Sequence, residues 1–208
     1  MSANPAQAGT QSGSDPRELL RRALDQAEAL LRHSSPLTPE LLGAPTPCTE
    51  YDLRTLLGHL VGAAHRIAYA GEGGRMGDVA AAVGQVADDD WPGAVRRART
   101  RCVAAWADDA RLERMIEAPW GTAPGRAVLS VYVQEIATHT WDAARVLDPK
   151  GEFALDPELA EFALATAQQV LPADRRGEGV PFDAVQPVPE GADAYARLAG
   201  WLGRRVIG

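Results

Sequence analysis

The chain of 208 residues has almost no lysine and little cysteine. Lys150 is the single lysine among 21 basic residues, so the other 20 are arginines. Arginine, alanine and glycine have GC-rich codons, and their abundance indicates a GC-rich genome. The two cysteines, Cys48 and Cys102, cannot build a framework of paired thiols. Their scarcity favours a reducing cytoplasm as the location of the protein.

Long apolar runs are missing as well. No stretch reaches the roughly 18 consecutive apolar residues that a membrane helix needs. The first residues, MSANPAQAGTQSGSD, lack the basic and apolar regions of a signal peptide. We expect residues 1–14 to form a flexible polar tail. Because 46% of the chain is hydrophobic, residues 15–208 are expected to form one domain with one good core. The lack of a long apolar run argues against a membrane-spanning segment.

Positive charge is not in excess. The formal net charge of -7 argues against a nucleic-acid or anionic membrane partner. One cluster of arginines is spread over the exposed side of a predicted helix and is expected to be a solvated face: Arg96, Arg97, Arg99 and Arg101. We expect small molecules as partners, and a monomer or a homodimer as the oligomeric state.

The alternating pattern of β-strands is not found with any strength, whereas helical spacing recurs along the chain. The expected helices span residues 16–32, 49–69, 91–108, 127–147, 157–171 and 195–205. A short turn is expected at 39–42, a short helix at 79–86, an irregular segment at 173–191, and a loop where Pro119, Gly121, Pro124 and Gly125 occur. We predict an all-α fold, a bundle of four main helices with additional C-terminal helices.

The segment 127–147, AVLSVYVQEIATHTWDAARVL, is the expected centre of the fold. One side of this helix is apolar and the far side is polar: Leu129, Val133, Ile136, Ala143 and Leu147 against Ser130, Gln134, Thr138 and Arg145. Glu135 and His139 are four residues apart, about 40° around the axis, on the flank of the apolar side. A buried carboxylate is costly unless it is paired or bound to a cation. The pair could hold one zinc ion, or it could be a Glu–His hydrogen bond in the core or on a partly solvated flank.

A third candidate ligand comes from the helix expected at 49–69. His59 lies on the edge of its apolar stripe, whereas His65 is rotated to another face. In a bundle these two helices can face each other, which would bring His59 toward Glu135 and His139. Three ligands leave one open position, which is typical of catalytic zinc and not of structural zinc. An ordinary core or surface histidine is the alternative for His59.

Two further residues flank this candidate site. Cys48 is a possible fourth ligand, although it precedes the helix and follows Pro47. Asp142 lies one turn after His139 on the same face, where its carboxylate can accept a hydrogen bond from the imidazole and so orient it.

Two motifs resemble a known family. TPCTEYDLRTLLGHL, residues 46–60, and QEIATHTWDAARVLD, residues 134–148, are similar to signatures of the mycothiol-dependent maleylpyruvate isomerase N-terminal domain, in the DinB-like superfamily. The segments FDAVQPVP and RLAGWLGRR resemble the ends of its shorter, single-domain members. The resemblance covers most of residues 16–208. Tyr51 stands where a Trp is common, and we expect the separate C-terminal domain of the true isomerase to be missing, so maleylpyruvate is not the expected substrate.

The resemblance implies a DinB-like four-helix bundle that binds zinc through His59, Glu135 and His139. It also implies an actinobacterial enzyme that uses a low-molecular-weight thiol, mycothiol. The metal would hold the thiol as a thiolate, which attacks a small electrophile in isomerisation or S-transfer. An arginine such as Arg75 or Arg145 would hold a substrate carboxylate. The alternatives are a non-catalytic metal- or ligand-binding regulatory module and a bundle in which the metal is only a structural clip.

Overall fold

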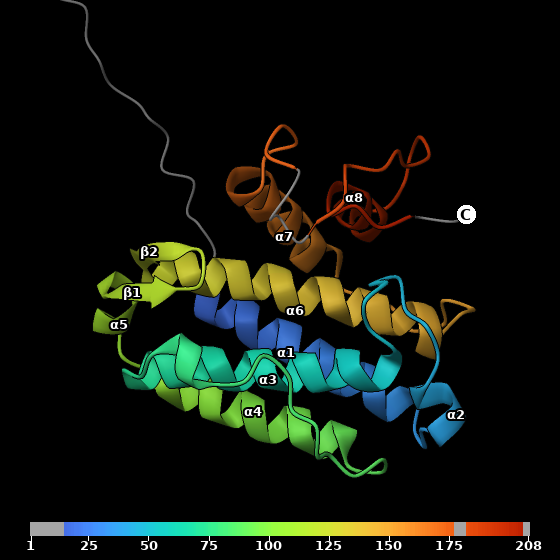
Figure 1. The fold of residues 1–208 in the computed structure, drawn as a ribbon, viewed down its shortest axis with the longest axis horizontal. Helices are drawn as coiled ribbons and strands as arrows, with labels where there is room; N and C mark the ends of the chain where they lie inside the picture. Colours follow the sequence, from blue (N-terminus) through green and yellow to red (C-terminus); the bar gives the residue numbers. More distant parts are fainter. Residues whose placement is uncertain (1–14, 177–181, 206–208) are drawn as a thin grey trace, which may run out of the picture.

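The computed structural model describes residues 15–176 and 182–205. The predicted tail at residues 1–14 lies outside the described residues. Within them the structure consists of helices α1 to α8, one 3-10 turn and a small hairpin of two strands (Figure 1). The predicted all-α class is therefore confirmed. No helix of this described part is both long and apolar enough to cross a membrane.

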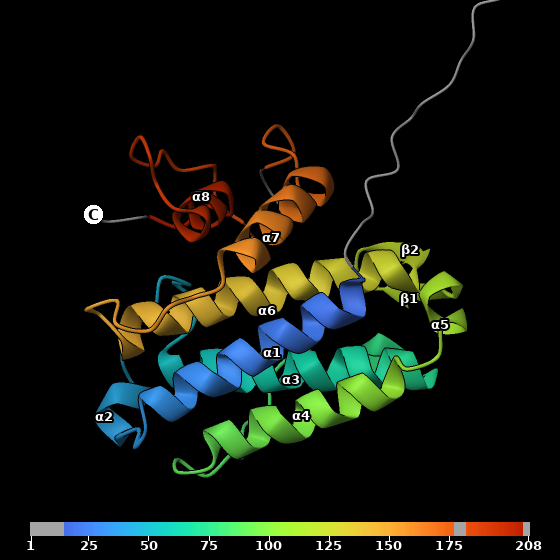
Figure 2. The same cartoon turned by 180° about the vertical axis from the view of Figure 1, so that it is seen from behind.

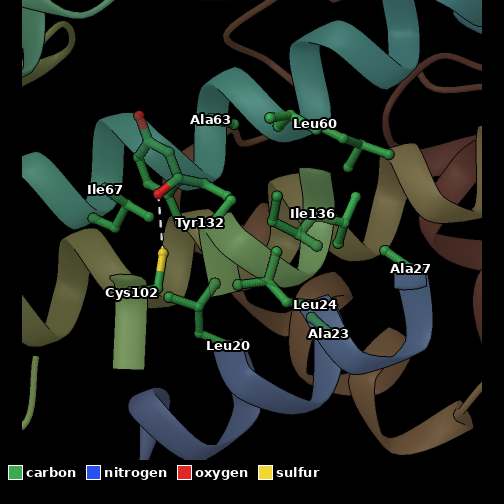
Figure 3. Close-up of a cluster of buried hydrophobic side chains, with 14 of the residues drawn as sticks. Leu20, Ala23, Leu24, Ala27, Leu60, Ala63, Ile67, Cys102, Tyr132 and Ile136 are labelled. Atoms are coloured by element: carbon green, nitrogen blue, oxygen red, sulfur yellow. Dashed lines mark hydrogen bonds between the residues drawn. The ribbon is translucent and has the colours of Figure 1, made fainter. Parts of the chain in front are cut away.

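Four long helices form the bundle: α1 (Pro16–His33), α3 (Leu53–Glu72), α4 (Trp91–Ala105) and α6 (Gly125–Leu147). They lie side by side in both views, and α1 runs in the same direction as α6 (Figures 1 and 2). Their apolar faces meet in one core, part of which Figure 3 shows with Leu24 of α1, Leu60 of α3 and Ile136 of α6. The predicted four-helix bundle is confirmed.

Local capping explains where these helices begin. The Asp15 carboxylate accepts a hydrogen bond from the Arg17 N–H ahead of α1, and Pro16 occupies the first helical position. The Asp52 carboxylate accepts a hydrogen bond from the Thr55 N–H, so α3 begins at Leu53. The predicted start at Thr49 is wrong because Asp52, and not Thr49, satisfies the free N–H groups of the first turn.

The α4 helix begins where it was predicted to begin but ends earlier than predicted. It begins at Trp91 but ends at Ala105, three residues before the expected position. Arg96 and Arg97 are exposed, whereas Arg99 and Arg101 are half-buried. Ion pairs link Arg97 to Asp90 and Arg101 to Glu72 at 2.7 and 2.6 Å.

The segment after α3 is extended, and the short helix expected at 79–86 is wrong. A 3-10 turn, η1 (Met76–Asp78), precedes it. The extended chain then crosses α3 at two glycines, where the Val83 N–H donates to the Gly58 carbonyl at 3.0 Å. A Cβ added at Gly62 would lie 2.7 Å from the Ala81 carbonyl oxygen. The absence of a side chain on α3 therefore permits this close crossing.

A hairpin occupies the stretch that the sequence indicated as a loop. Strands β1 (Met115–Ala118) and β2 (Gly121–Pro124) pair antiparallel, with Ala118 opposite Gly121. Each strand has only four residues, too few for a clear alternation. Two short helices, α2 (Pro39–Leu42) and α5 (Ala110–Glu113), complete the connections.

The C-terminal helices α7 (Pro157–Val170) and α8 (Ala194–Trp201) pack against α6 on the side opposite the bundle core (Figure 1). They form a second apolar cluster with Ala137 and Trp141 of α6. Gln134 and Thr138, which were expected on a solvent side, are only 4% and 2% exposed. That expectation is wrong because α7 and α8 cover a second side of α6.

Candidate metal centre

The structure brings together the three residues that the sequence indicated as ligands. His59 comes from α3, and Glu135 and His139 come from α6. The His59 Nε2 atom lies 2.8 Å from Glu135 Oε1, and the His139 Nε2 atom lies 3.6 Å from the same oxygen. One ligand atom from each residue lies within 4.8 Å of the others. Two helices that face each other therefore provide an N, O, N donor set.

The extended segment over α3 orients His59. The Nδ1 atom of His59 lies 2.9 Å from the Ala81 carbonyl oxygen, which can only accept a hydrogen bond. The Nδ1 atom therefore carries the proton and donates it. In the neutral imidazole the Nε2 atom is then a bare acceptor that points at Glu135. Glycine at position 62 permits this arrangement, because Ala81 passes directly over it.

A buried acid–base chain orients His139. Its Nδ1 atom lies 3.0 Å from Oδ2 of Asp142, which is 0% exposed. Arg204, which follows α8, donates to both Asp142 oxygens at 3.0 and 2.8 Å. Burial raises the pKa of Asp142, but Arg204 and His139 together lower it below its usual value. The carboxylate is therefore ionised and fixes the His139 proton on Nδ1.

The consequence is that three acceptors converge on one point. When both imidazoles are neutral, their Nε2 lone pairs face the Glu135 carboxylate, and the three acceptor atoms repel one another unless a proton or a metal ion lies between them. The donor types and their spacing suit a divalent metal such as zinc. The residues present therefore fit the metal that the sequence indicated.

The electrostatics of the metal-free cluster agree with this argument. Burial raises the pKa of Glu135, but hydrogen bonds from His139 and His59 outweigh it and hold that pKa well below its usual value. Burial also lowers the pKa of His139, whereas its hydrogen bonds to Asp142 and Glu135 raise the pKa to about 9. Without a metal, protons supply the positive charge. The cluster thus favours a cation at its centre.

The site is covered but can be reached. The His139 side chain is 8% exposed and that of His59 is 12% exposed, while the Glu135 side chain is 28% exposed. The Tyr51 ring lies against both imidazoles, with ring centroids 5.4 Å from His59 and 6.3 Å from His139. A small molecule can therefore approach the cluster from the side on which Glu135 is exposed.

Cys48 belongs to an overlapping group with His139 and Asp142, whose ligand atoms also lie within 4.8 Å. This group is a poorer metal site because the Asp142 oxygens already accept hydrogen bonds from Arg204 and His139. Burial raises the pKa of the Cys48 thiol to about 11, although Arg204 opposes this effect. The side chain is therefore a neutral thiol in this environment.

We expect Cys48→Ser to retain a full equivalent of metal per chain. The three convergent acceptors do not include the Cys48 sulfur, so removing it takes away no ligand. Elemental analysis of the purified variant beside the wild-type protein is the measurement. Loss of metal in this variant would mean that the site is closed by four protein ligands and is structural.

A cavity of about 1070 Å³ lies beside the cluster. Its walls include Cys48, Trp141, Phe182 and Arg204. The three candidate ligands do not line this cavity. Hydrogen bonds from Arg204 on the cavity wall to Asp142, and from His139 to Asp142, connect the cavity to the cluster. The volume is large enough for a small organic molecule.

Several arginine positions can now be distinguished. Arg145 lines the cavity with Arg204 and Arg205, whereas Arg75 does not. Arg204 could not be recognised as a site residue from local pattern, although it lies in the RLAGWLGRR segment that resembles the family. His65 lies 3.4 Å from an Arg101 nitrogen and takes no part in the cluster.

The comparisons with known proteins agree with the motifs. Residues 20–144 match the family described as the mycothiol maleylpyruvate isomerase N-terminal domain. Two relatives are uncharacterized proteins of Mycobacterium tuberculosis, from the strains CDC 1551 / Oshkosh and ATCC 25618 / H37Rv. Each is 30% identical over 193 residues, which cover 92% of this chain and 99% of the relative. No solved structure gives a significant match.

Proposed function

Because the chain belongs to the family of the mycothiol maleylpyruvate isomerase N-terminal domain, we propose that it is a metal-dependent enzyme that uses a low-molecular-weight thiol. The proposed metal is zinc or another divalent ion, held by His59, Glu135 and His139. The proposed thiol is mycothiol, and the proposed reaction is its attack on a small electrophile, in S-transfer or in cis/trans isomerisation.

The observation that carries this proposal is the convergence of three acceptor atoms. The Ala81 carbonyl and the Asp142 carboxylate each accept a hydrogen bond from an imidazole Nδ1, so in the neutral form of each imidazole the Nε2 atom is an acceptor that faces Glu135. Three ligands leave a coordination position for an outside molecule, which a closed structural site does not. When bound, zinc would deprotonate a coordinating thiol and so supply a strong nucleophile at neutral pH.

The residues of the chain then have separate tasks. Ala81 and Asp142 keep the two imidazoles in the tautomer that binds a cation, and Arg204 keeps Asp142 ionised. Tyr51 lies against both imidazole rings and restricts access of water. Cys48 is not needed as a nucleophile, which agrees with the high pKa of its thiol. Arg145, on the cavity wall, is our candidate for holding a carboxylate of a ligand.

One observation favours a second candidate function. The cavity is lined by Cys48, Arg145 and Arg204 but by none of the three candidate ligands. A regulatory module that binds a ligand in the cavity, with the metal as a separate element, would have this layout. The cobalt experiment below distinguishes the two candidates because only the enzyme requires the thiol to meet the metal.

With cobalt in place of zinc, we expect mycothiol to produce the intense charge-transfer absorption of a cobalt–thiolate bond. The physical reason is charge: a divalent ion with one carboxylate and two neutral imidazoles carries a net +1, which one thiolate neutralises. Absorption spectroscopy during a mycothiol titration is the measurement, with His59→Ala as the variant that should lose the band.

A thioether analogue of the thiol serves as the control for non-specific binding, because it cannot become a thiolate. If neither mycothiol nor another cellular thiol changes the cobalt spectrum at millimolar concentration, the thiol chemistry is wrong. The binding-module function would then be the better account of the cavity.

A further inference from the structure

Three side chains with metal-binding atoms meet at one end of the bundle, apart from the cluster of His59, Glu135 and His139. They are His33, the last residue of α1; Asp148, which follows α6; and Glu152, in the loop that leads to α7. One ligand atom from each lies within 4.8 Å of the others. His33 and Glu152 are exposed to solvent, and Asp148 is 9% exposed.

Negative charge accumulates at this end. Helices α1 and α6 run in the same direction and end on the same side of the molecule (Figures 1 and 2). The carboxyl end of a helix carries about half a negative charge. The carboxylates of Asp148 and Glu152 add two full negative charges, and Lys150 in the same loop offsets one of them. Arg32, beside His33, pairs with Glu28 at 2.7 Å. In the part of the chain that the structure describes, no arginine or lysine forms an ion pair with Asp148 or Glu152, so a cation is favoured here.

The loop after α6 is already folded into the required shape. The Asp148 Oδ2 atom accepts a hydrogen bond from the Phe153 N–H at 2.7 Å, and this bond helps to keep the pKa of Asp148 below its usual value. The Phe153 ring lies against the His33 imidazole, with ring centroids 5.6 Å apart. These two contacts hold the loop on the end of α1 and place Glu152 beside the other two residues.

We propose that His33, Asp148 and Glu152 form a second metal site, which takes a divalent transition-metal ion such as Zn²⁺ or Ni²⁺. One imidazole nitrogen and two carboxylate oxygens suit such ions, and water completes the coordination. The exposed side chains of His33 and Glu152 can close on the ion. Because this site is more exposed than the first, its affinity is expected to be lower. The bound ion links the end of α1 to the α6–α7 loop and so stabilises the folded chain by mass action.

Zinc titration of the metal-free, full-length protein tests this site. Calorimetry and elemental analysis after dialysis against zinc should give two equivalents per chain for the wild-type protein. The variants His33→Ala and Glu152→Gln should each lose the weaker equivalent, with the zinc affinity of this site reduced at least about tenfold. Even residues that only orient a metal ligand change metal affinity by about this factor. His65→Ala, which removes a histidine outside both clusters, should behave as the wild type does.

The His139→Ala variant separates this proposal from the proposed function. It should lose the tighter equivalent and keep the weaker one, and zinc should then raise its melting temperature. The double variant His139→Ala/His33→Ala should show no such rise. The second site would be overturned if His33→Ala still bound a second equivalent of zinc. It would also be overturned if His139→Ala bound no zinc. A wild-type protein with one equivalent that is lost in His33→Ala supports this site and contradicts the first.

Discussion

His139→Ala should reduce the metal content of the purified protein from about one equivalent at the proposed thiol-binding site to almost none. The His139 imidazole is one of three donors, and its Nε2 atom lies 3.6 Å from the Glu135 oxygen that His59 also approaches. Two remaining donors on separate helices hold a divalent ion much more weakly, by at least about 100-fold, because even groups that only orient a ligand account for about 10–100-fold. Elemental analysis after dialysis against metal-free buffer is the measurement.

The bundle should stay folded in this variant, with a loss of stability of roughly 1–3 kcal/mol. Its stability comes mainly from the apolar faces of the helices, and Asp142 keeps its ion pair with Arg204. Circular dichroism should therefore show a native helix content. His65→Ala is the matched control and should retain the metal. If His139→Ala still carried a full equivalent that did not depend on His33, the assignment of His139 as a ligand would be wrong.

Arg204→Ala should have the largest effect on stability. Arg204 is 8% exposed and donates to both oxygens of Asp142, which is fully buried. Removing one partner of a buried ion pair leaves a charge without compensation, which costs roughly 3–5 kcal/mol. For a chain of this length the melting temperature should fall by about 10 °C. The metal affinity should also fall, by about 10–100-fold, because His139 loses its fixed orientation. Thermal unfolding and metal titration are the measurements.

Arg205→Ala provides the control for this prediction. It removes the same kind of side chain from the next position, where the residue is exposed, and should change stability by less than about 0.5 kcal/mol. The double variant Arg204→Ala/Asp142→Asn should recover part of the loss because neither charge is then left alone. If Arg204→Ala were as mild as Arg205→Ala, the buried ion pair would not stabilise the site.

The pair Glu135 and His139 could be predicted because its geometry is local. Any α-helix places residues four apart on one face, so the spacing on 127–147 determined that both side chains point the same way. The helix periodicity also indicated that His59 faces this pair from a second helix. The caps at Asp15 and Pro16 are local as well, which is why the start of α1 was predicted correctly.

The hairpin and the crossing segment were missed for the opposite reason. β1 and β2 have four residues each, and their pairing depends on a partner strand and not on local pattern. The extended path of residues 79–83 depends on the surface of α3, where Gly58 and Gly62 leave room for it. Nothing in the composition of this segment specifies that contact.

The sequence by itself therefore determined the helices and which residues of α3 and α6 could meet, because these follow from the 3.6-residue period of the α-helix. Only the tertiary structure decided what makes the cluster suited to a cation. The Ala81 carbonyl reaches His59 across 22 positions of the chain, and Arg204 reaches Asp142 across 62. α7 and α8 bury the second side of α6. Such contacts result from the packing of whole elements, and no local pattern encodes which distant atom will fill the space beside a given side chain.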